Sequence, residues 1–262
     1  MNKIPGSQQY ISFFDTYYNS FKNLNSEQTR NFEIKKDHSF RVADLMRSIA
    51  ELIEIENELE SLVYITGLYH DIGRFSQFVK FGTFNDNVSI DHAALSVEVL
   101  GENNVIAGLG KENKEAVQTA IFYHNKWKVP LSFSQKVKTL AYLLRDADKL
   151  DILAVLCDYY ENKSKEPNHT LTWELPDSHK ISEEVSEIIL QKKQLPKDIV
   201  KNELDLKVFQ MSWAYDLNFK SSFQILLQKR YIKRIYNTLP KSEKIIEFYR
   251  SIKIFIENQI SA

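Results

Sequence analysis

The stretch GLYHDIGRF, residues 67–75, places an adjacent imidazole and carboxylate at the end of an apolar run with helical spacing. Such a run points into a core, and polar groups buried there must find partners. A metal ion satisfies both groups at once, because imidazole nitrogens and carboxylate oxygens are common ligands of transition metals. His70 and Asp71 therefore indicate a candidate metal site whose other ligands must come from elsewhere in the chain.

Further histidines along the sequence are candidates for the other ligands of this site. Four of the six histidines lie in or at the edge of a predicted helix, namely His38, His70, His92 and His124. Helical bundles commonly build metal sites from one or two ligands per helix. A single histidine near an apolar face is more often a hydrogen-bonded core residue, so the metal hypothesis depends on the combination.

A third polar cluster lies in RDADKLD, residues 145–151, within an otherwise apolar helical segment. Its aspartates are Asp146, Asp148 and Asp151. Steps of two and three residues distribute them around a helix, so a solvated face is one interpretation. The other is that one of them is a metal ligand.

The elements that must position these residues are helical almost throughout. Apolar residues recur at three- and four-residue steps, as in an amphipathic helix. The pattern predicts helices over 8–24, 32–55, 58–70, 92–100, 112–124, 134–160, 181–191, 204–213, 219–237 and 242–260. Asp91 is predicted to cap the fourth of these. We expect a polar and aromatic connection over 74–90 and a loop over 161–180, where LTWEL could form a short strand.

Composition narrows the class of protein. The chain has 262 residues, of which 43% are hydrophobic, so it can bury a sizeable core. Only 7 Gly and 6 Pro leave little room for the turns of an all-β protein. With 34 basic against 35 acidic residues, charge gives no reason to expect nucleic acid or an anionic membrane as partner.

The compartment is predicted from the cysteine count and the apolar runs. The single cysteine, Cys157, excludes an intrachain disulfide and suits a reducing compartment. The segment 1–10 lacks the apolar core of a signal peptide. No run approaches the roughly 18 apolar residues of a membrane span. We therefore expect a cytoplasmic protein.

Three motifs occur in order over roughly residues 36–160: DHSFRV around His38, LYHDIGRF around His70 and Asp71, and RDADKLD. Together they resemble the H…HD…D signature of the HD-domain superfamily of metal-dependent phosphohydrolases. The resemblance implies a compact all-α bundle. Because the sequence has no internal repeat and no Ser/Gly linker, we expect a single domain over 1–262 rather than two, with an HD core about 30–160 and a C-terminal helical extension about 181–262. The last ligand of the signature corresponds to Asp148, and Asp146 is the alternative.

The resemblance extends to the number of metal ions. Members with two extra histidines before the last aspartate hold two metals, bridged by the aspartate of the dyad, and His92 and His124 occupy that interval. The implied ligands are His38, His70, Asp71 and Asp148 for one ion, and Asp71, His92 and His124 for the other. Mixed imidazole and carboxylate ligation suits Fe, Mn, Co, Ni or Zn, and which of these binds stays open.

Two such cations would activate a bridging hydroxide for attack on a phosphate ester. The expected substrate is a nucleotide or a similar small molecule. Arg74 and Lys149 are expected to bind the phosphate, with surface salt bridges as the equal alternative. The C-terminal third is expected to close over the site. Further candidates to contact substrate are Asp151, Trp213, Asp216 and Asn218, together with His169, Trp173 and His179 of the long loop.

Other functions share these residue types. HD-fold di-iron oxygenases have the same order of ligands, so ligand types alone do not separate them from hydrolases. A cyclic-nucleotide or dinucleotide phosphodiesterase is also possible, but HNKWKVP, residues 124–130, departs from the pattern of the cyclic-di-GMP enzymes. Six apparently intact ligand positions argue against a catalytically silent binding domain. The oligomeric state stays open.

Overall fold

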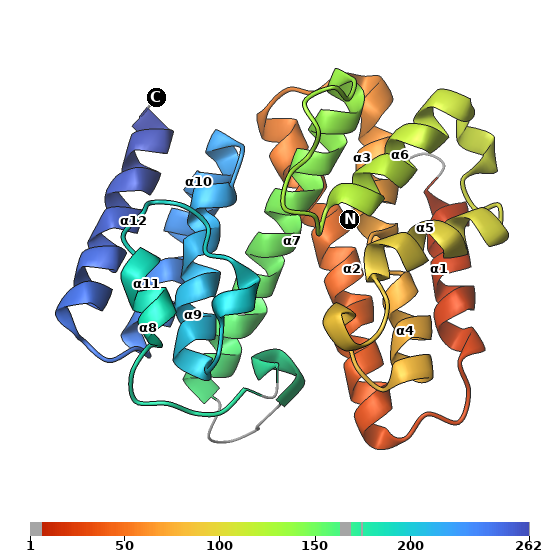
Figure 1. Cartoon of the computed structure of the whole chain (residues 1–262). Coiled ribbons are helices and arrows are strands. Elements are labelled where there is room, and N and C mark those ends of the chain that lie inside the picture. The colour runs from red at the N-terminus through yellow and green to blue at the C-terminus, as the bar shows by residue number, and fades with distance from the viewer. Residues whose placement is uncertain (1–6, 163–168, 174, 262) are drawn as a thin grey trace. The chain divides into compact units, whose positions relative to one another are not determined.

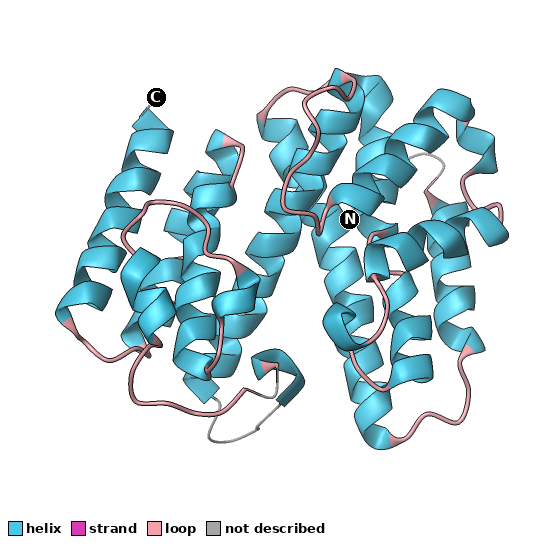
Figure 2. Cartoon of the chain, in the orientation of Figure 1, coloured by secondary structure: helices cyan, strands magenta, loops and turns pink. Residues whose placement is uncertain are grey.

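The structure is a computed structural model that describes residues 7–162, 169–173 and 175–261. In these ranges all regular secondary structure is helical, without a strand, so the all-α prediction is confirmed (Figure 2). The strand considered for LTWEL is absent from its described part: residues His169–Thr172 form a 3₁₀ turn, and residue 174 lies outside the described residues.

The chain divides into two compact units, Met1–Asp148 and Lys149–Ala262. The helices of the first unit are α1 (Gln8–Ser20), α2 (Ser26–Leu52), α3 (Asn57–Tyr69), α4 (Gly73–Phe81), α5 (His92–Glu102) and α6 (Lys111–Tyr123). The long helix α7 (Gln135–Asn162) contributes its first part to this unit and its remainder to the second. The single domain expected over 1–262 stays a prediction.

In the first unit α2 packs along α3, α3 against α6, α6 against α5, and α5 against α4 (Figure 1). The aromatic side chains of α1 supply core residues. Phe14 is fully buried and makes edge contacts with Phe40 and Phe75. The chain of packed helices brings their ends together at the candidate site.

Local chemistry fixes where two of these helices begin. The Asn25 side chain accepts a hydrogen bond from the Gln28 N–H, and the Gln28 side chain accepts one from the Asn25 N–H, which is a capping box. Asp91 caps α5 as predicted, because its Oδ1 accepts from the N–H groups of Ala93 and Ala94. Capping satisfies N–H groups that have no partner within the helix.

The prediction of an irregular connection over 74–90 is wrong in its first part. Residues Gly73–Phe81 form α4, with Phe75, Gln77 and Phe78 buried. The two phenylalanines stand three residues apart on one helix face, a short apolar pattern that polar neighbours obscure. Gly82 ends the helix at φ +69°, a conformation that glycine adopts without steric cost.

In its described residues, the second unit contains the end of α7 and five further α-helices. They are α8 (Glu183–Ile188), α9 (Glu203–Ser212), α10 (Lys220–Gln228), α11 (Tyr231–Asn237) and α12 (Glu243–Ser261). α12 packs against α10 and α11, and α9 packs against α11. The helix predicted over 219–237 is interrupted, because Arg230 adopts φ +56° and separates α10 from α11. Among the described residues, no helix combines the length and apolarity needed to cross a membrane.

Gly73 follows the His-Asp pair closely and permits α4 to approach α5. Its N–H donates to Ser96 Oγ at 3.0 Å. A Cβ at this position would lie 2.6 Å from Ser96 N and 2.9 Å from the carbonyl oxygen of His92, both backbone atoms. Backbone cannot move aside as a flexible side chain does, so only glycine fits without displacing α5.

We predict that Gly73→Ala lowers the free energy of unfolding by about 1–3 kcal/mol, the usual effect of overpacking. Urea unfolding followed by circular dichroism measures it. Gly101→Ala in α5 is the matched control, since a Cβ there meets no atom within 4 Å. That variant should be neutral or more stable by up to about 1 kcal/mol, because alanine favours the helix. Equal stability of both variants would contradict the close approach of α4 to α5.

Candidate metal centre

Six polar side chains converge within the first unit, each carried by the end or the face of a helix. They are His38 in α2, His70 at the C-cap of α3, Asp71 directly after it, His92 at the start of α5, His124 at the C-cap of α6 and Asp148 in α7. The four imidazoles and the Asp71 carboxylate are buried. The structure thus brings together all six residues that the sequence resemblance implied as ligands.

Their donor atoms form two adjoining groups. In the first, His38 Nε2 lies 3.2 Å from His70 Nε2 and 3.1 Å from Asp148 Oδ1. In the second, His92 Nε2 lies 3.1 Å from His124 Nε2. The two groups adjoin, since the rings of His70 and His124 have their centroids 5.2 Å apart.

The Asp71 carboxylate lies between the two groups. Its Oδ2 is 3.6 Å from His38 Nε2 and 3.7 Å from His70 Nε2, whereas its Oδ1 is 3.4 Å from His92 Nε2. One oxygen therefore faces each group. This is the arrangement required of a carboxylate that bridges two cations.

Two of the histidines are oriented by the helices that end at them. His70 Nδ1 lies 2.7 Å from the carbonyl oxygen of Gly67, and His124 Nδ1 lies 2.6 Å from that of Ile121. A carbonyl oxygen can only accept, so both Nδ1 atoms carry the proton and donate it. These carbonyls belong to the last helical turn, and that of Ile121 also accepts from the His124 N–H at 3.4 Å. A neutral imidazole with its proton on Nδ1 presents a lone pair at Nε2.

His92 has the same orientation through a different acceptor. Its Nδ1 donates to Asp86 Oδ2 at 2.6 Å, which also leaves a lone pair at Nε2. Burial and the nearby Arg74 charge lower the pKa of His92. Burial, with His92 and His70 close by, lowers the pKa of His124 to about 3. Both rings are therefore neutral near pH 7.

The second group of donors consequently fits a cation. Neutral His92 and His124 direct two lone pairs at each other across 3.1 Å, with no proton available to form a hydrogen bond between them. Buried acceptors without a donor are costly. A divalent transition metal between these nitrogens and Asp71 would satisfy all of them, and imidazole is a preferred ligand of Fe, Mn, Co, Ni and Zn.

The carboxylates are in the charge state that a metal needs. Burial opposes ionisation of Asp71, but the charges of Lys35 and Arg74 outweigh it and hold its pKa well below the ordinary value. Burial is likewise outweighed at Asp148, whose pKa is held well below the ordinary value chiefly by the hydrogen bond with His38 at 3.1 Å. Metal binding therefore does not require either carboxylate to lose a proton near pH 7.

Of the two candidate aspartates in α7, position favours Asp148 as the ligand. The clusters of donor atoms among the described residues include Asp148 and leave out Asp146. Asp146 is fully buried, and so is most of its neighbour Arg145. Arg145 Nη1 donates to the carbonyl oxygens of His124 and Lys126, so it fixes the end of α6 that carries His124. The sequence analysis missed this anchoring role.

Lys35 is a second residue that the sequence analysis missed. Its Nζ lies 2.7 Å from Asp71 Oδ2, and its side chain is 18% exposed. It precedes His38 by three residues in α2, so the two side chains share a helix face. That spacing is the signal from which Lys35 could have been found.

Arg74, predicted to bind phosphate, has several protein partners. Its Nη1 donates to Phe84 O at 2.6 Å and to Asp86 Oδ1 and Gln77 Oε1 at 2.9 Å. Its Nε is buried without a hydrogen-bond partner, 3.4 Å from Asp71 Oδ1. A substrate contact for Arg74 stays a prediction, while its contacts favour an anchoring role.

The other predicted substrate contacts belong to the second unit. Lys149 Nζ forms an ion pair with Asp216 Oδ2 at 2.9 Å, and Asp151 is buried. Trp213 is buried against Phe209, which favours a core role for its side chain. These residues stay predicted contacts.

The remaining predicted substrate contacts lie in the loop expected over 161–180 or in the second unit after it. Trp173 packs on Phe209, with Lys197 over its ring, and His179 is exposed. Asn218 is exposed, and its Nδ2 donates to the carbonyl oxygen of Asp216. The side chain of His169 lies outside the described residues.

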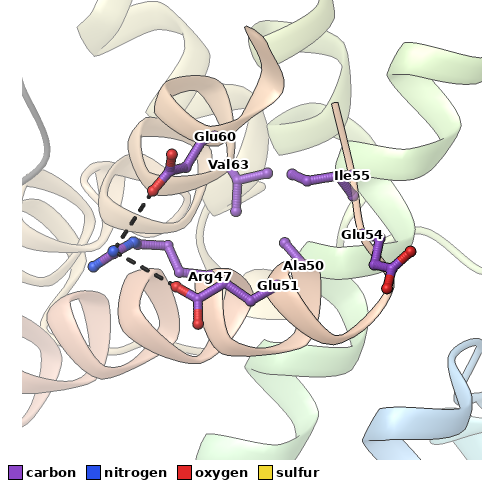
Figure 3. Close-up of a pocket in the computed structure, with 7 residues that line it drawn as sticks. All are labelled: Arg47, Ala50, Glu51, Glu54, Ile55, Glu60 and Val63. Atoms are coloured by element: carbon purple, nitrogen blue, oxygen red, sulfur yellow. Dashed lines mark ion pairs between the residues drawn. The ribbon is translucent and has the colours of Figure 1, made fainter. Parts of the chain in front are cut away.

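A surface pocket of about 340 Å³ lies elsewhere in the first unit, between the C-terminal end of α2 and α3 (Figure 3). Its lining comprises Arg47, Ala50, Glu51, Glu54, Ile55, Glu60 and Val63. The Arg47 guanidinium lies 3.7 Å from both Glu51 and Glu60. Three carboxylates against one guanidinium would repel a phosphate, and no predicted site residue lines this pocket.

Comparison with known families supports the sequence resemblance. The family model of the HD domain matches residues 36–163. This range contains all six converging residues, and the predicted resemblance is confirmed. Comparison with curated proteins and with solved structures gave no match.

We predict that His124→Ala reduces the metal content from about two ions per chain to about one, because the second group loses one of its three donors. Metal analysis of the loaded, gel-filtered protein measures this, with circular dichroism to show that helical content is retained. His179→Ala, an exposed histidine of the second unit, is the control and should keep two ions. Two ions retained by His124→Ala would assign His124 to the core rather than to the metal.

Proposed function

We propose that this chain, whose residues 36–163 match the family model of the HD domain, is a metal-dependent hydrolase of the HD-domain superfamily and hydrolyses a small phosphate ester such as a nucleotide. One observation carries the proposal. Asp71 lies between two groups of imidazole donors, with one carboxylate oxygen toward each. Two cations sharing a carboxylate are the typical arrangement for displacement at phosphorus.

The six converging residues would hold the ions, with Asp71 shared between them. When bound, divalent transition metals would acidify a water molecule and polarise the phosphoryl oxygens of the substrate. The Nδ1–H bonds of His70, His92 and His124 keep their Nε2 atoms directed at the proposed ions, and burial excludes bulk water. These fixed contacts mean that the donors need no reorganisation during the reaction.

Lys35 is our first choice for the residue that binds the outer phosphate oxygens. It is partly exposed, and its ammonium lies beside the carboxylate that the substrate must approach. With cations bound to Asp71, that ammonium would be repelled from them and attracted by the charge of a phosphate. Arg74, Lys149, Asp151, Trp213 and Asp216 remain further proposed contacts.

We predict that the Mn²⁺-loaded protein releases inorganic phosphate from at least one member of a panel of nucleotides and small phosphate esters. Asp71→Ala should lose both the activity and the metal, because the shared carboxylate supports both ions. Asp37→Ala, an exposed carboxylate next to His38, is the matched control and should keep both. Phosphate release would be followed colorimetrically.

Two outcomes would contradict the proposed phosphate-ester hydrolysis. Near-normal turnover and full metal content in Asp71→Ala would overturn the proposal. So would substrate-dependent oxygen uptake by the iron-loaded protein without phosphate release, which would assign the chain to the di-iron oxygenases.

Lys35→Met should lower kcat/KM by about 1.5–3 kcal/mol, the value of a hydrogen bond to a charged group, without loss of metal. Lys36→Met is the matched control on the same helix. Lys36 pairs with Asp15 at 2.9 Å and lies over the Tyr18 ring, away from Asp71. Steady-state kinetics of both variants would show the difference. Unchanged kinetics in Lys35→Met would return Lys35 to a purely structural ion pair.

A further inference from the structure

His92 differs from the other proposed ligands in where it stands on its helix. His70 and His124 cap helix C-termini, where a carbonyl oxygen three residues back accepts their Nδ1–H. His92 is the first residue of α5. A helix N-terminus presents N–H groups and no free carbonyl oxygen of an earlier turn. The Nδ1–H of His92 must therefore find an acceptor outside its own helix.

Asp86 supplies that acceptor. It begins the short 3₁₀ turn Asp86–Val88 between α4 and α5, and its Oδ2 lies 2.6 Å from His92 Nδ1. Partial burial opposes ionisation of Asp86, but His92, Arg74 and Gln77 outweigh it and lower its pKa. An ionised carboxylate accepts a stronger hydrogen bond than a neutral carbonyl does.

The Asp86 carboxylate is itself held from several sides. Its Oδ1 accepts from Arg74 Nη1 and from Gln77 Nε2, both at 2.9 Å. The Gln77 amide also donates to Ser89 Oγ and to Ile90 O, which ties the turn to α4. Asp86 therefore cannot rotate away from His92 without breaking charge-assisted bonds.

We infer that Asp86 is a positioning residue, which with Arg74 fixes the tautomer and direction of His92 and so sets the affinity of the second metal group. The inference rests on the proposed function, because it concerns the ions proposed there. Carboxylate partners of ligating histidines fix the ring and raise its basicity, and their loss typically lowers metal affinity about 10- to 100-fold.

Arg74 acts in this scheme through two carboxylates. Its Nη1 holds Asp86, and its Nε lies 3.4 Å from Asp71 Oδ1, the oxygen that faces His92. One guanidinium thus contacts both the shared carboxylate and the residue that orients His92. These contacts give Arg74 a positioning role beside the substrate contact proposed above.

The test compares Asp86→Asn and Asp86→Ala with Asn87→Ala, an exposed control in the same turn. Chelator competition with Co²⁺, followed by its visible absorption, measures the affinity of each ion. We expect the second ion to bind about 10- to 100-fold more weakly in Asp86→Ala, less so in Asp86→Asn, whose amide oxygen still accepts, and normally in Asn87→Ala. The first ion should be unaffected in all three.

A metal-free readout separates this inference from the proposed function. In ¹⁵N NMR spectra of the apoprotein, His92 should be the Nδ1–H tautomer in wild type and a mixture in Asp86→Ala. An unchanged His92 signal in Asp86→Ala, or an unchanged affinity for the second ion, overturns the inference alone. A wild-type protein that takes up no metal overturns the proposed function, and one that takes up a single ion overturns the second site and this inference with it.

Discussion

The lone pairs of two buried, neutral imidazoles face each other across 3.1 Å, and this unfavourable contact is the constraint on which the rest of the centre depends. Neither His92 nor His124 can rotate to relieve it, because Asp86 and the Ile121 carbonyl hold their Nδ1–H groups. A positive charge between the nitrogens would remove the cost of such a contact. The hydrogen bonds at the two Nδ1 atoms thus determine what the two Nε2 atoms can bind.

Packing brings this constraint about. The helix ends that carry His70, His92 and His124 meet because α3 packs against α6, α6 against α5 and α5 against α4. Gly73 allows α4 to approach α5 closely, since any Cβ there would meet the backbone of α5. Arg145 fixes the end of α6 from α7. The glycine of the HDIG stretch therefore serves the same site as the histidine and aspartate before it.

Sequence reasoning predicted the helical class and the Asp91 cap, because periodicity and residue type carry that information locally. The six converging residues were implied by the resemblance to the HD-domain superfamily. Sequence reasoning missed α4, whose two phenylalanines stand among polar residues, and so left Asp86 in an apparently irregular connection. It also missed Lys35, although the three-residue step to His38 was visible. The contacts of Arg74 with Asp86 and Phe84 join residues 10 and 12 positions apart through a turn, and no pattern in the sequence encodes them.

The central claim is that Asp71 is shared between two metal ions. Anomalous scattering from crystals of the Mn²⁺-loaded protein tests it most directly. The account predicts two peaks, one among His38, His70 and Asp148 and the other between His92 and His124, each within bonding distance of a different oxygen of Asp71. A single peak, or two peaks of which one does not touch Asp71, would contradict it.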